Sequence, residues 1–439
     1  KTQHNEVAPA QHEMAPIYST ANIATDHNQL VMETMKKVAR RHNFECLLHE
    51  KPFAGVNGSG KHDNWSLVTN TGKNLLSPGK TPYDNKQFLL FLSAVIAAVD
   101  DNAALLRMSA SNPGNDHRLG ANEAPPAIIS IFLGEQLEDI VEQILQNGTA
   151  THSNKGERMD IGVHTIPPIK KDATDRNRTS PFAFTGNKFE FRMVASSMSI
   201  AGANTVLNAT VADVLQSMAD RMEKTDDLDK TVDEIIYETL KEHQKVIFNG
   251  NGYSDEWIAE AEKRGLPNVK TMVDATASLL YPKTIEMFER QHVYTKTELE
   301  SRAEINYEAY AKAINIEAKT MIHMASKEYI PAIISYVTSL GDSINSISAA
   351  CAEADLSVQK DLLTTCSSLL AKAQTALYAL KDADKKANAM EEGKEQAEFF
   401  RDTVFTAMAD LRAPIDELEM IVDKEYWPVP SYGDMLFEV

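Results

Sequence analysis

The chain has 439 residues, 43% of them hydrophobic, and a net charge of −19 at pH 7. This length suffices for two or three domains with an ample core, and the strong negative charge argues against a nucleic-acid partner. No apolar run reaches the ~18 residues of a membrane span, and the first residues do not form a signal peptide, so no membrane partner is expected. Cys46, Cys351 and Cys366 lack metal-type spacing and suit a reducing compartment, which predicts a cytoplasmic protein.

Up to about residue 200, short strand-like runs alternate with glycine and proline turns. Strands are predicted at residues 44–49, 65–69, 127–132 and 189–194. Between them, an apolar helix is predicted over residues 83–108, with Thr81 as its cap and Pro82 in its first turn. A further helix is predicted over residues 135–146, followed by a polar, basic loop.

After residue 200 the pattern is almost wholly helical. Apolar residues recur at i, i+3 and i+4 over residues 204–225, 231–244, 256–263, 297–327, 331–354, 356–383 and 394–412. Thr295 and Glu298 form a capping box for the longest of these helices. Residues 248–257 contain a turn with two glycines and then a helix capped by Ser254, and we expect a structural role for them.

Two glutamates near the start of the chain, Glu6 and Glu13, are separated by seven positions. If residues 6–13 are helical, both carboxylates lie on one face two turns apart, whereas Pro9 favours an irregular loop. The carboxylates can converge in either case. Such a pair is common in an acidic protein and indicates no site by itself.

Residues 57–62, Asn-Gly-Ser-Gly-Lys-His, form a glycine-broken turn that ends in a histidine. Gly58 and Gly60 permit positive φ and a close backbone approach to a ligand, while Asn57 can hydrogen-bond through both ends of its amide. His62 follows the bend. Taken alone, a surface hairpin with a solvated histidine is the simpler interpretation.

Residues 188–192 alternate as a strand does, which places Glu190 and Arg192 on one face and two phenylalanines on the other. Taken alone, this indicates a salt-bridged solvent face. Together with the preceding segments it provides three carboxylates, an imidazole and arginines. That combination suits a site for divalent metal and a transferring phosphoryl group, because charge stabilisation dominates such a reaction.

In their order and wording these segments resemble glutamine synthetase, and specifically its long type III branch. Residues 5–13 resemble the family's metal segment, Glu-Val-x-x-Gly-Gln-x-Glu, with Ala10 where glycine is usual. Residues 57–62 match its Asn-Gly-Ser-Gly-x-His loop. Residues 118–125 resemble the stretch that binds glutamate and closes the ammonia site, shortened by about one residue. Residues 176–180 and 189–192 resemble the phosphate-binding arginines and the last metal carboxylate.

The resemblance implies two or more divalent ions per site, Mg²⁺ or Mn²⁺, between which the sequence does not choose. Glu6 and Glu13 would hold one ion. His62 and Glu190 would hold the second, near the nucleotide phosphates.

The same resemblance implies the substrate contacts. Asn57 and Gly58 would contact glutamate, and Arg118 its carboxylate or the phosphorylated intermediate. Glu123 would take up the proton of ammonium and cover the site. Its position between Gly120 and the two prolines at 125–126 suits such a lid.

The resemblance also implies an ATP site. Ser66, Arg178 and Arg192 would contact the nucleotide, and Arg178 and Arg192 would stabilise the transferring phosphoryl group. The family usually has a further arginine shortly after this stretch, but residues 181–184 read Pro-Phe-Ala-Phe here. One nucleotide contact is therefore expected from elsewhere in the protein.

For the fold, the resemblance implies an α+β catalytic domain with a curved antiparallel sheet, followed by a mostly helical C-terminal region. We predict a catalytic core at residues 1–200, its helical remainder at 201–290, and a helical bundle at 291–439. Residues 134–175 are interpreted as an insertion. It carries Lys155, Arg158, Lys170 and Lys171, for which a solvated loop is preferred to contact with nucleotide.

The implied activity joins ammonia to the γ-carboxylate of L-glutamate with ATP, through γ-glutamyl phosphate, and yields glutamine, ADP and phosphate. The alternatives are a ligase joining glutamate to a larger amine, and a catalytically silent structural or regulatory homologue. The family also implies a dodecamer of two stacked hexameric rings. Family members carry a small β-domain and two further metal-binding glutamates before the residue-5 segment, so we expect this chain alone to be an inactive fragment.

Overall fold

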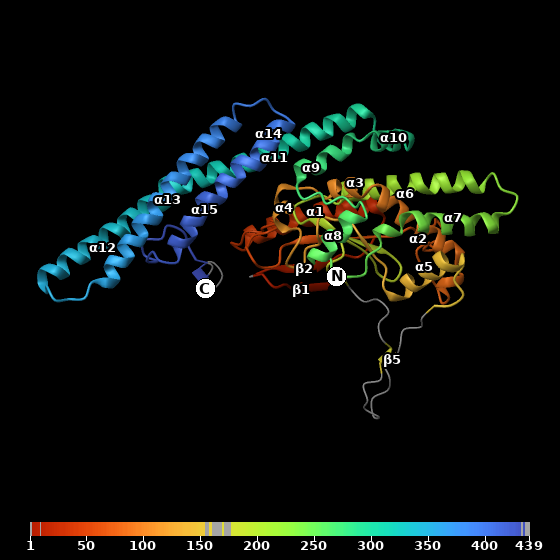
Figure 1. Ribbon diagram of the computed structural model, residues 1–439, viewed down its shortest axis with the longest axis horizontal. Coiled ribbons are helices and arrows are strands. Elements are labelled where there is room, and N and C mark those ends of the chain that lie inside the picture. Colours follow the sequence, from red (N-terminus) through yellow and green to blue (C-terminus); the bar gives the residue numbers. More distant parts are fainter. Residues whose placement is uncertain are drawn as a thin grey trace. The chain divides into compact units, whose positions relative to one another are not determined.

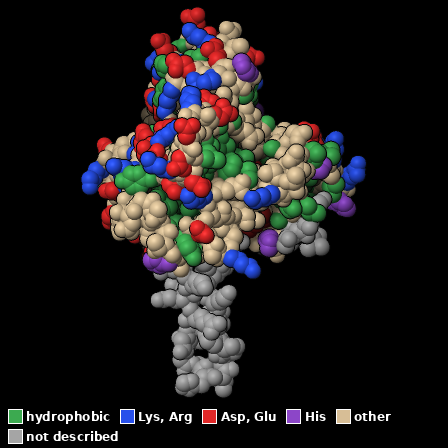
Figure 2. Space-filling view, turned by 90° about the vertical axis from the view of Figure 1, so that its right-hand side faces the viewer, with side chains coloured by type: hydrophobic (Ala, Val, Ile, Leu, Met, Phe, Trp, Pro, Cys, Tyr) green, Lys and Arg blue, Asp and Glu red, His purple; other side chains and the backbone are tan. Residues whose placement is uncertain are grey.

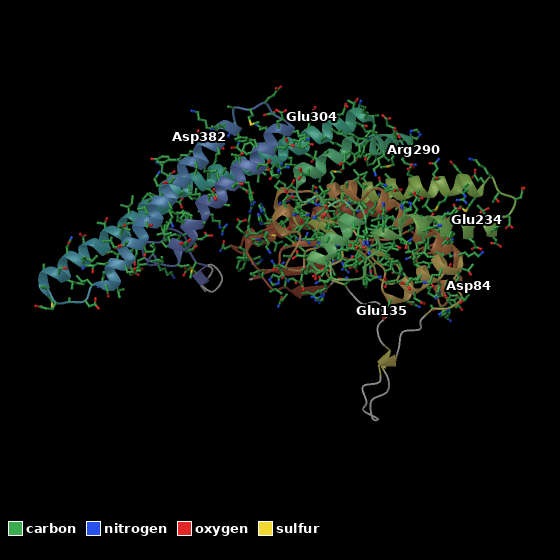
Figure 3. All side chains as sticks on the ribbon, in the orientation of Figure 1. Asp84, Glu135, Glu234, Arg290, Glu304 and Asp382 are labelled. Atoms are coloured by element: carbon green, nitrogen blue, oxygen red, sulfur yellow. The ribbon has the colours of Figure 1, made fainter. Side chains whose placement is uncertain are left out.

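The computed structural model describes residues 2–8, 10–153, 158–159, 169–170, 177–431 and 433–434. The chain divides into two compact units, Lys1–Ala303 and Glu304–Val439 (Figure 1). Glu304, where the second unit begins, is labelled in Figure 3. On the face that Figure 2 shows, acidic and basic side chains are intermixed, so the net negative charge is not gathered into one patch there.

A four-stranded sheet in the order β3–β8–β7–β4 forms the centre of the first unit. Strands β3 (Gly60–Trp65), β8 (Phe189–Ala195) and β7 (Phe182–Phe184) pair antiparallel, as expected. The predicted antiparallel sheet is mixed at one edge, because β4 (Ile131–Phe132) pairs parallel with β7. Phenylalanines of β7 and β8 pack ring against ring, with centroids 4.9–6.0 Å apart.

Three helices form the main apolar layer of the first unit. Helix α2 (Lys86–Asp101) packs against α6 (Ala201–Met222) and α7 (Leu228–His243), and Figure 1 shows them side by side. Eleven of the sixteen residues of α2 are buried, as its almost continuous apolar sequence requires. One core cluster joins all three helices through Ala94, Met218 and Ile235.

The prediction of a single helix over residues 83–108 is wrong, because the helix is interrupted at Asn102. A 3₁₀ turn (Pro82–Asp84) precedes α2, and α3 (Ala103–Ser109) follows it at a bend of 80°. At the break, the Asn102 side chain donates to the Ala98 carbonyl at 3.0 Å, competing with the helical hydrogen bonds. The cap of α2 is Asn85, whose Oδ1 accepts from Phe88 N at 3.1 Å, and not Thr81.

Within the described residues, no single helix is long and apolar enough to cross a membrane. The bent pair α2 and α3 passes a test of length and composition, but α2 is the buried core helix described above.

The predicted strands at 44–49, 65–69 and 127–132 are largely wrong. Residues 44–49 form no strand in the described structure, and Phe44 and Leu47 are 71% exposed. Only Trp65 of the second run lies in a strand, and only the last two residues of the third run form β4. An extended apolar run becomes a strand only where a partner strand lies beside it, which local sequence does not specify.

The remaining elements of the first unit are short, apart from α1. The described residues between β1 and β2 form the turn of a hairpin, and residues 12–13 lie in β2. The helical alternative for residues 6–13 is therefore wrong, and the irregular-loop alternative holds only for the turn. The elements are β1 (Thr2–Asn5), β2 (His12–Ala15), α1 (Ala21–Arg41), α4 (Pro113–Arg118), α5 (Glu135–Asn147), β5 (Arg158–Met159), β6 (Ile169–Lys170), α8 (Asp255–Lys263), α9 (Met272–Thr276) and α10 (Pro282–Arg290), with 3₁₀ turns at Gln244–Val246 and Ala277–Leu280. The helix predicted over 135–146 and the cap at Ser254 are confirmed.

The second unit is helical, as predicted. Helix α11 (Lys296–Met324) crosses the boundary between the units, and its capping box is confirmed by Thr295 N to Glu298 Oε2 at 2.8 Å. A π-helical turn (Ala325–Tyr329) follows directly before Pro331, which lacks the amide that a regular helix uses. The others are α12 (Ile330–Ala350), α13 (Ser357–Ala387), α14 (Lys394–Phe399), a π turn (Phe400–Val404) and α15 (Phe405–Glu419). Helix α13 packs against both α12 and α15.

A buried histidine links the ends of α7 and α2. His243 is 8% exposed, and its Nδ1 lies 2.8 Å from Asp100 Oδ2. Burial lowers the pKa of His243, but the hydrogen bond to Asp100 and the charges of Asp101 and Asp100 outweigh it, so the pKa is raised. The pair therefore stabilises the fold in its charged form.

Replacing His243 by Gln should remove a pH-dependent part of the stability. Because the folded pKa is raised, the contribution is complete below the unfolded pKa of 6.5 and is lost as the pH rises through the folded value. We expect H243Q to cost roughly 1–3 kcal/mol at pH 6 and less at pH 9. Urea midpoints of both proteins at the two pH values measure this, and an equal gap at both would contradict it.

Candidate functional site

The predicted site residues come from four segments of the first unit that are far apart in sequence. These are the β1–β2 hairpin, the 57–62 turn leading into β3, the loop after α4, and residues 177–192. The contacts described below bring all four segments together.

Arg118 lies beneath the glycine turn and is 5% exposed. Its NH1 donates to Asn115 Oδ1 at 3.0 Å, and its NH2 donates to the Arg192 carbonyl at 3.2 Å. A Cβ at Gly60 would lie 2.0 Å from NH2, and one at Gly58 would lie 2.5 Å from the Glu50 carbonyl oxygen. The absence of a side chain at Gly60 therefore leaves the space that the guanidinium fills, and Gly58 allows the close approach to the Glu50 carbonyl.

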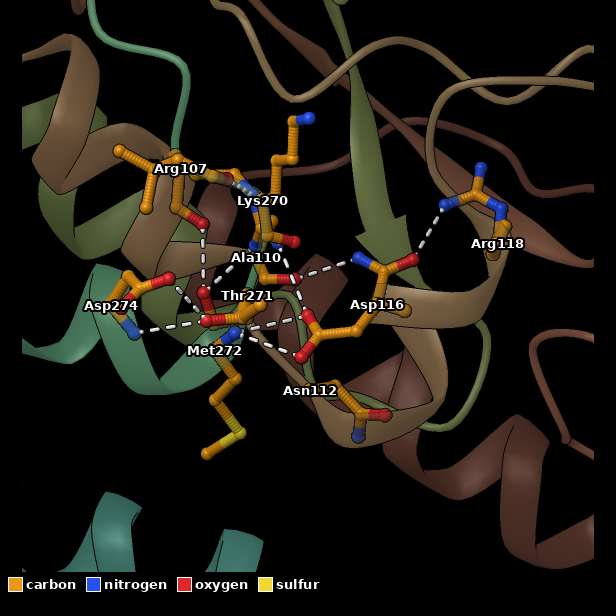
Figure 4. Close-up of polar contacts among 12 residues, drawn as sticks. Arg107, Ala110, Asn112, Asp116, Arg118, Lys270, Thr271, Met272 and Asp274 are labelled. Atoms are coloured by element: carbon orange, nitrogen blue, oxygen red, sulfur yellow. Dashed lines mark hydrogen bonds and ion pairs between the residues drawn. The ribbon is translucent and has the colours of Figure 1, made fainter. Parts of the chain in front are cut away.

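Helix α4 carries Arg118 and is fixed by a buried network (Figure 4). Asp116 accepts from Met272 N at 2.9 Å and from the fully buried Arg107 at 3.2 Å. Asn115, also fully buried, donates to the Ala110 and Met193 carbonyls at 2.7 Å each. Burial lowers the pKa of Arg118 to about 10, against the effect of Glu50, so the guanidinium stays charged at neutral pH.

His62 stands at an irregularity in the β3–β8 pairing. The register shifts between Lys61 and Asp63, and such shifts re-aim a side chain. The imidazole Nδ1 lies 3.9 Å from Glu190 Oε2, and the side chain is 48% exposed. Burial and the Arg192 guanidinium lower the pKa of His62, while Glu190 and Glu13 oppose them. The ring is therefore neutral at pH 7, the form that binds metal.

Glu190 and Arg192 lie on one face of β8, as the alternation predicted. Arg192 Nε and NH2 donate to Glu190 Oε2 at 3.3 and 3.1 Å. Thr185 Oγ1 donates to Oε1 at 3.2 Å, and Lys188 Nζ lies 3.6 Å from the same oxygen. Burial raises the pKa of Glu190, but the opposite effect of Arg192, His62 and Lys188 is larger. The pKa is therefore lowered, and this carboxylate is ionised.

The β1–β2 hairpin carries Glu6 and Glu13 and is fastened to the glycine turn. Gln11 Nε2 donates to the Gly58 carbonyl at 3.1 Å and to Ser59 Oγ at 3.0 Å. Burial, then Glu13 and then Glu123 raise the pKa of Glu6. Carboxylates that raise one another's pKa lack a counter-charge, so the donor chemistry here fits a divalent ion.

The backbone conformation of this hairpin turn explains why the family segment that residues 5–13 resemble usually has glycine where this chain has Ala10. Ala10 has a φ of 53°, in the left-handed region that favours glycine. The alanine thus imposes a small conformational strain on this turn.

Glu123 is held between two residues that are also predicted to bind ligands. Asn57 Nδ2 donates to its Oε2 at 2.9 Å, and Arg178 NH1 donates to its Oε1 at 2.6 Å. Both Asn122 and Glu123 have positive φ, at 53° and 65°. Consecutive non-glycine residues in this region are strained, which is common at ligand-binding loops. The side chains of Glu123 and Arg178 are 45% and 74% exposed.

Ser66 lies just past the end of β3. Its Oγ donates to Asn74 Oδ1 at 3.1 Å and to the Asn187 carbonyl at 2.9 Å. These contacts join the residue-74 turn to the start of β8. The structure thus gives Ser66 a backbone-bracing contact, and its nucleotide contact stays a prediction.

Several predicted cations fall outside the described side chains. They are Arg176, Lys155, Arg158, Lys170 and Lys171, and their part in a nucleotide site stays a prediction.

Sequence reasoning missed residues that build the site without belonging to its charged motifs. Glu50 is 2% exposed, accepts from Ser197 N at 2.9 Å, and through its carbonyl accepts from Ser59 N at 2.8 Å. Gln11 lies in the 5–13 segment, but its sequence did not predict a role for it. No local pattern marks Glu50, because its partners lie elsewhere in the chain.

Two family models match the chain. The model described as "Glutamine synthetase, catalytic domain" matches residues 1–128, and that described as "Glutamine synthetase C-terminal domain" matches residues 231–348. Curated proteins match along the whole chain. It is 46% identical to "Glutamine synthetase" of Butyrivibrio fibrisolvens and 45% identical to "Type-3 glutamine synthetase" of Dictyostelium discoideum, over 100% of its length in both cases.

The chain belongs to the glutamine synthetase family. A third relative, "Glutamine synthetase" of Bacteroides fragilis strain YCH46, is 41% identical over 100% of the chain. The chain spans 63%, 60% and 61% of these three relatives' own lengths, so they extend well beyond the matched region. Family membership agrees with the mixed fold and the mostly helical C-terminal region described above.

Replacing Gly60 by Ala should destabilise the first unit by about 1–3 kcal/mol, because the new methyl group would collide with the buried Arg118 guanidinium. Gly202→Ala is the matched control, since its Cβ would meet nothing closer than 3.4 Å and it lies in a helix. Denaturant unfolding followed by tryptophan fluorescence measures both. Equal midpoints for G60A and G202A would show that Arg118 does not fill this space.

Proposed function

We propose that this chain carries the catalytic apparatus for ATP-dependent ligation of ammonia to the γ-carboxylate of glutamate, through γ-glutamyl phosphate. The observation that supports it is the convergence of three kinds of group. These are the Glu6–Glu13 carboxyl pair, His62 beside Glu190, and Glu123 held by Asn57 and Arg178. Identity to curated glutamine synthetases over the whole chain supports the same reaction.

The metal-binding part of the proposal assigns Mg²⁺ or Mn²⁺ to two donor sets. Glu6 and Glu13 offer oxygens that already need a counter-charge, and His62 with Glu190 offers a nitrogen and an oxygen. Glu190 also accepts from Arg192, and a carboxylate has enough lone pairs to bind an ion as well. A bound divalent ion would neutralise phosphate charge during transfer.

The arginines of the site differ in whether their guanidinium donors are already bound within the protein or are free to move to a ligand. Arg192 is 4% exposed and commits its donors to Glu190 and to the Asn177 carbonyl, so it would present a fixed positive charge to the phosphates. Arg178 is largely exposed and can turn from Glu123 to a phosphoryl oxygen. Arg118 would contribute its buried charge to the proposed glutamate pocket, and Gly58 lies against its side chain.

The amide-forming step requires a base, because ammonium must lose a proton before its nitrogen can attack the acyl phosphate. Glu123 is the proposed acceptor. It is exposed, and its charge helps to raise the pKa of Glu6 in the hairpin. Covering the site would keep water from the acyl phosphate.

Self-association into two stacked hexameric rings and a cytoplasmic location are also part of this proposal. Both are supported by family membership alone. Sedimentation of the complete gene product tests the first, and cell fractionation tests the second.

Replacing His62 by Ala in the complete gene product should remove one Mn²⁺ site and lower turnover by roughly 100-fold or more, because the imidazole is a proposed ligand. Equilibrium dialysis with Mn²⁺ counts the sites, and coupled phosphate release measures turnover. His27→Ala, an exposed histidine of α1, is the control. Normal Mn²⁺ content with normal turnover in H62A would refute the assignment.

Replacing Glu123 by Ala should slow glutamine formation from ammonium about 10²–10⁴-fold, because the proton acceptor is lost. The same variant should retain most of its activity with hydroxylamine, which is largely unprotonated at neutral pH and needs no base. Measuring glutamine and γ-glutamyl hydroxamate side by side checks this. Equal losses with both nucleophiles would place Glu123 in another role.

The nucleophile assay also separates the alternatives. Phosphate release with a polyamine or alkylamine, and none with ammonium, would replace the first proposal by a γ-glutamyl-amine ligase. If no amine gives glutamate-dependent phosphate release, the remaining alternative is a catalytically silent homologue.

A further inference from the structure

Residues 248–257, given a structural role above, are fastened directly to the segment that carries Arg178. Asn177 Nδ2 donates to the Gly250 carbonyl, and Gly252 N donates to Thr179 Oγ1 at 2.8 Å. A Cβ on Gly252 would lie 2.9 Å from the Thr179 carbonyl oxygen, so only glycine permits this approach. The two segments therefore form one rigid wall of the site.

The other end of the same segment is fixed in the core. Phe248 N donates to the Ile131 carbonyl of β4 at 2.9 Å, and its ring stacks on Trp257 with centroids 3.7 Å apart. Ser254 caps α8 by accepting from Trp257 N at 3.2 Å. Tyr253 thus stands between two anchored points, and its backbone has little freedom to move.

Three side chains of residues 248–257 have a buried polar atom without a hydrogen-bond partner among the described residues: Asn249 Nδ2, Trp257 Nε1 and the Tyr253 hydroxyl. Of these, the Tyr253 hydroxyl is the one that Glu123, Arg118 and Arg192 affect electrostatically. The residue is only half-buried, but its hydroxyl oxygen is shielded from solvent and has no hydrogen-bond partner among the described residues. Burial and then the charge of Glu123 raise its pKa, while Arg118 and Arg192 oppose them. The hydroxyl therefore stays protonated at neutral pH and lies within electrostatic range of three proposed site residues. A buried donor without an acceptor costs stability and needs an explanation.

We propose that Tyr253 is a further substrate-binding residue, whose hydroxyl donates a hydrogen bond to an anionic oxygen of the substrate held near Arg118, Arg192 and Glu123. The groups around this point are the guanidiniums of Arg118 and Arg192, the Tyr253 hydroxyl donor and the Glu123 carboxylate. Because donors and positive charges outnumber the single carboxylate, an anionic ligand is favoured over a cation. That oxygen belongs either to a carboxyl group of glutamate or to the phosphoryl group in transfer, since both have the same acceptor chemistry. The proposal rests on the proposed function.

Tyr253→Phe in the complete gene product tests this, because it keeps the ring and removes only the hydroxyl. The melting temperature should stay the same or rise, since no protein partner is lost. If the acceptor is a glutamate carboxyl, the KM for glutamate should rise roughly tenfold with the KM for ATP unchanged. If it is the phosphoryl group, kcat should fall about tenfold with both KM values unchanged.

Tyr281→Phe is the control, because Tyr281 is a 42% exposed tyrosine of the same unit and no site contact is proposed for it. Calorimetric titration with glutamate, in the presence of a non-hydrolysable ATP analogue and Mg²⁺, gives a binding readout that does not depend on turnover. If Y253F equals the wild type in KM, kcat and glutamate affinity, the Tyr253 proposal is overturned and the proposed function stands. A wild-type protein that neither binds glutamate nor forms glutamine overturns the proposed function instead.

Discussion

The buried guanidinium of Arg118 is the interaction on which the rest of the site depends. A charge inside the protein must be surrounded by acceptors, and these come from α4 through Asn115 and from β8 through the carbonyls of Arg192 and Met193. A side chain at position 60 would collide with the guanidinium, and one at position 58 would collide with the Glu50 carbonyl and press on the Arg118 stem. Arg118 thus helps to set the position of the 57–62 turn relative to the strand that carries Glu190.

Around this anchor, the acids of the hairpin lack the counter-charge that Glu190 has. Glu190 is balanced by Arg192 and Lys188, but Glu13 and Glu123 raise the pKa of Glu6. This mutual repulsion destabilises the fold, and under the proposed function a bound cation would relieve it. The hydrogen bonds of Gln11 to the glycine turn hold the acidic hairpin in place against that repulsion.

Sequence alone could predict the features that are local or repeated. The amphipathic helices after residue 200 and the cap at Ser254 follow from spacing and capping chemistry, and the family followed from five short motifs. The break at Asn102 could not be predicted, because an apolar run gives no sign that a side-chain amide will compete with the helix. The parallel pairing of β4 could not be predicted either, since it depends on which strand lies beside Ile131. The burial of the Tyr253 hydroxyl arises from contacts between segments more than seventy residues apart, so residues 248–257 looked purely structural.

Under the proposed function, the contacts of Glu123 indicate how the loop after α4 responds to substrate binding. In this conformation its two carboxylate oxygens bind Asn57 and Arg178, the residues assigned to glutamate and to phosphate. Substrate atoms that bind those residues must therefore displace Glu123 from them, and the strained backbone at Asn122 and Glu123 lowers the cost of leaving. The released carboxylate then has neither of these partners at the moment when a proton acceptor is needed. Binding of the two substrates and preparation of the base would thus be the same event, driven by exchange of hydrogen-bond partners.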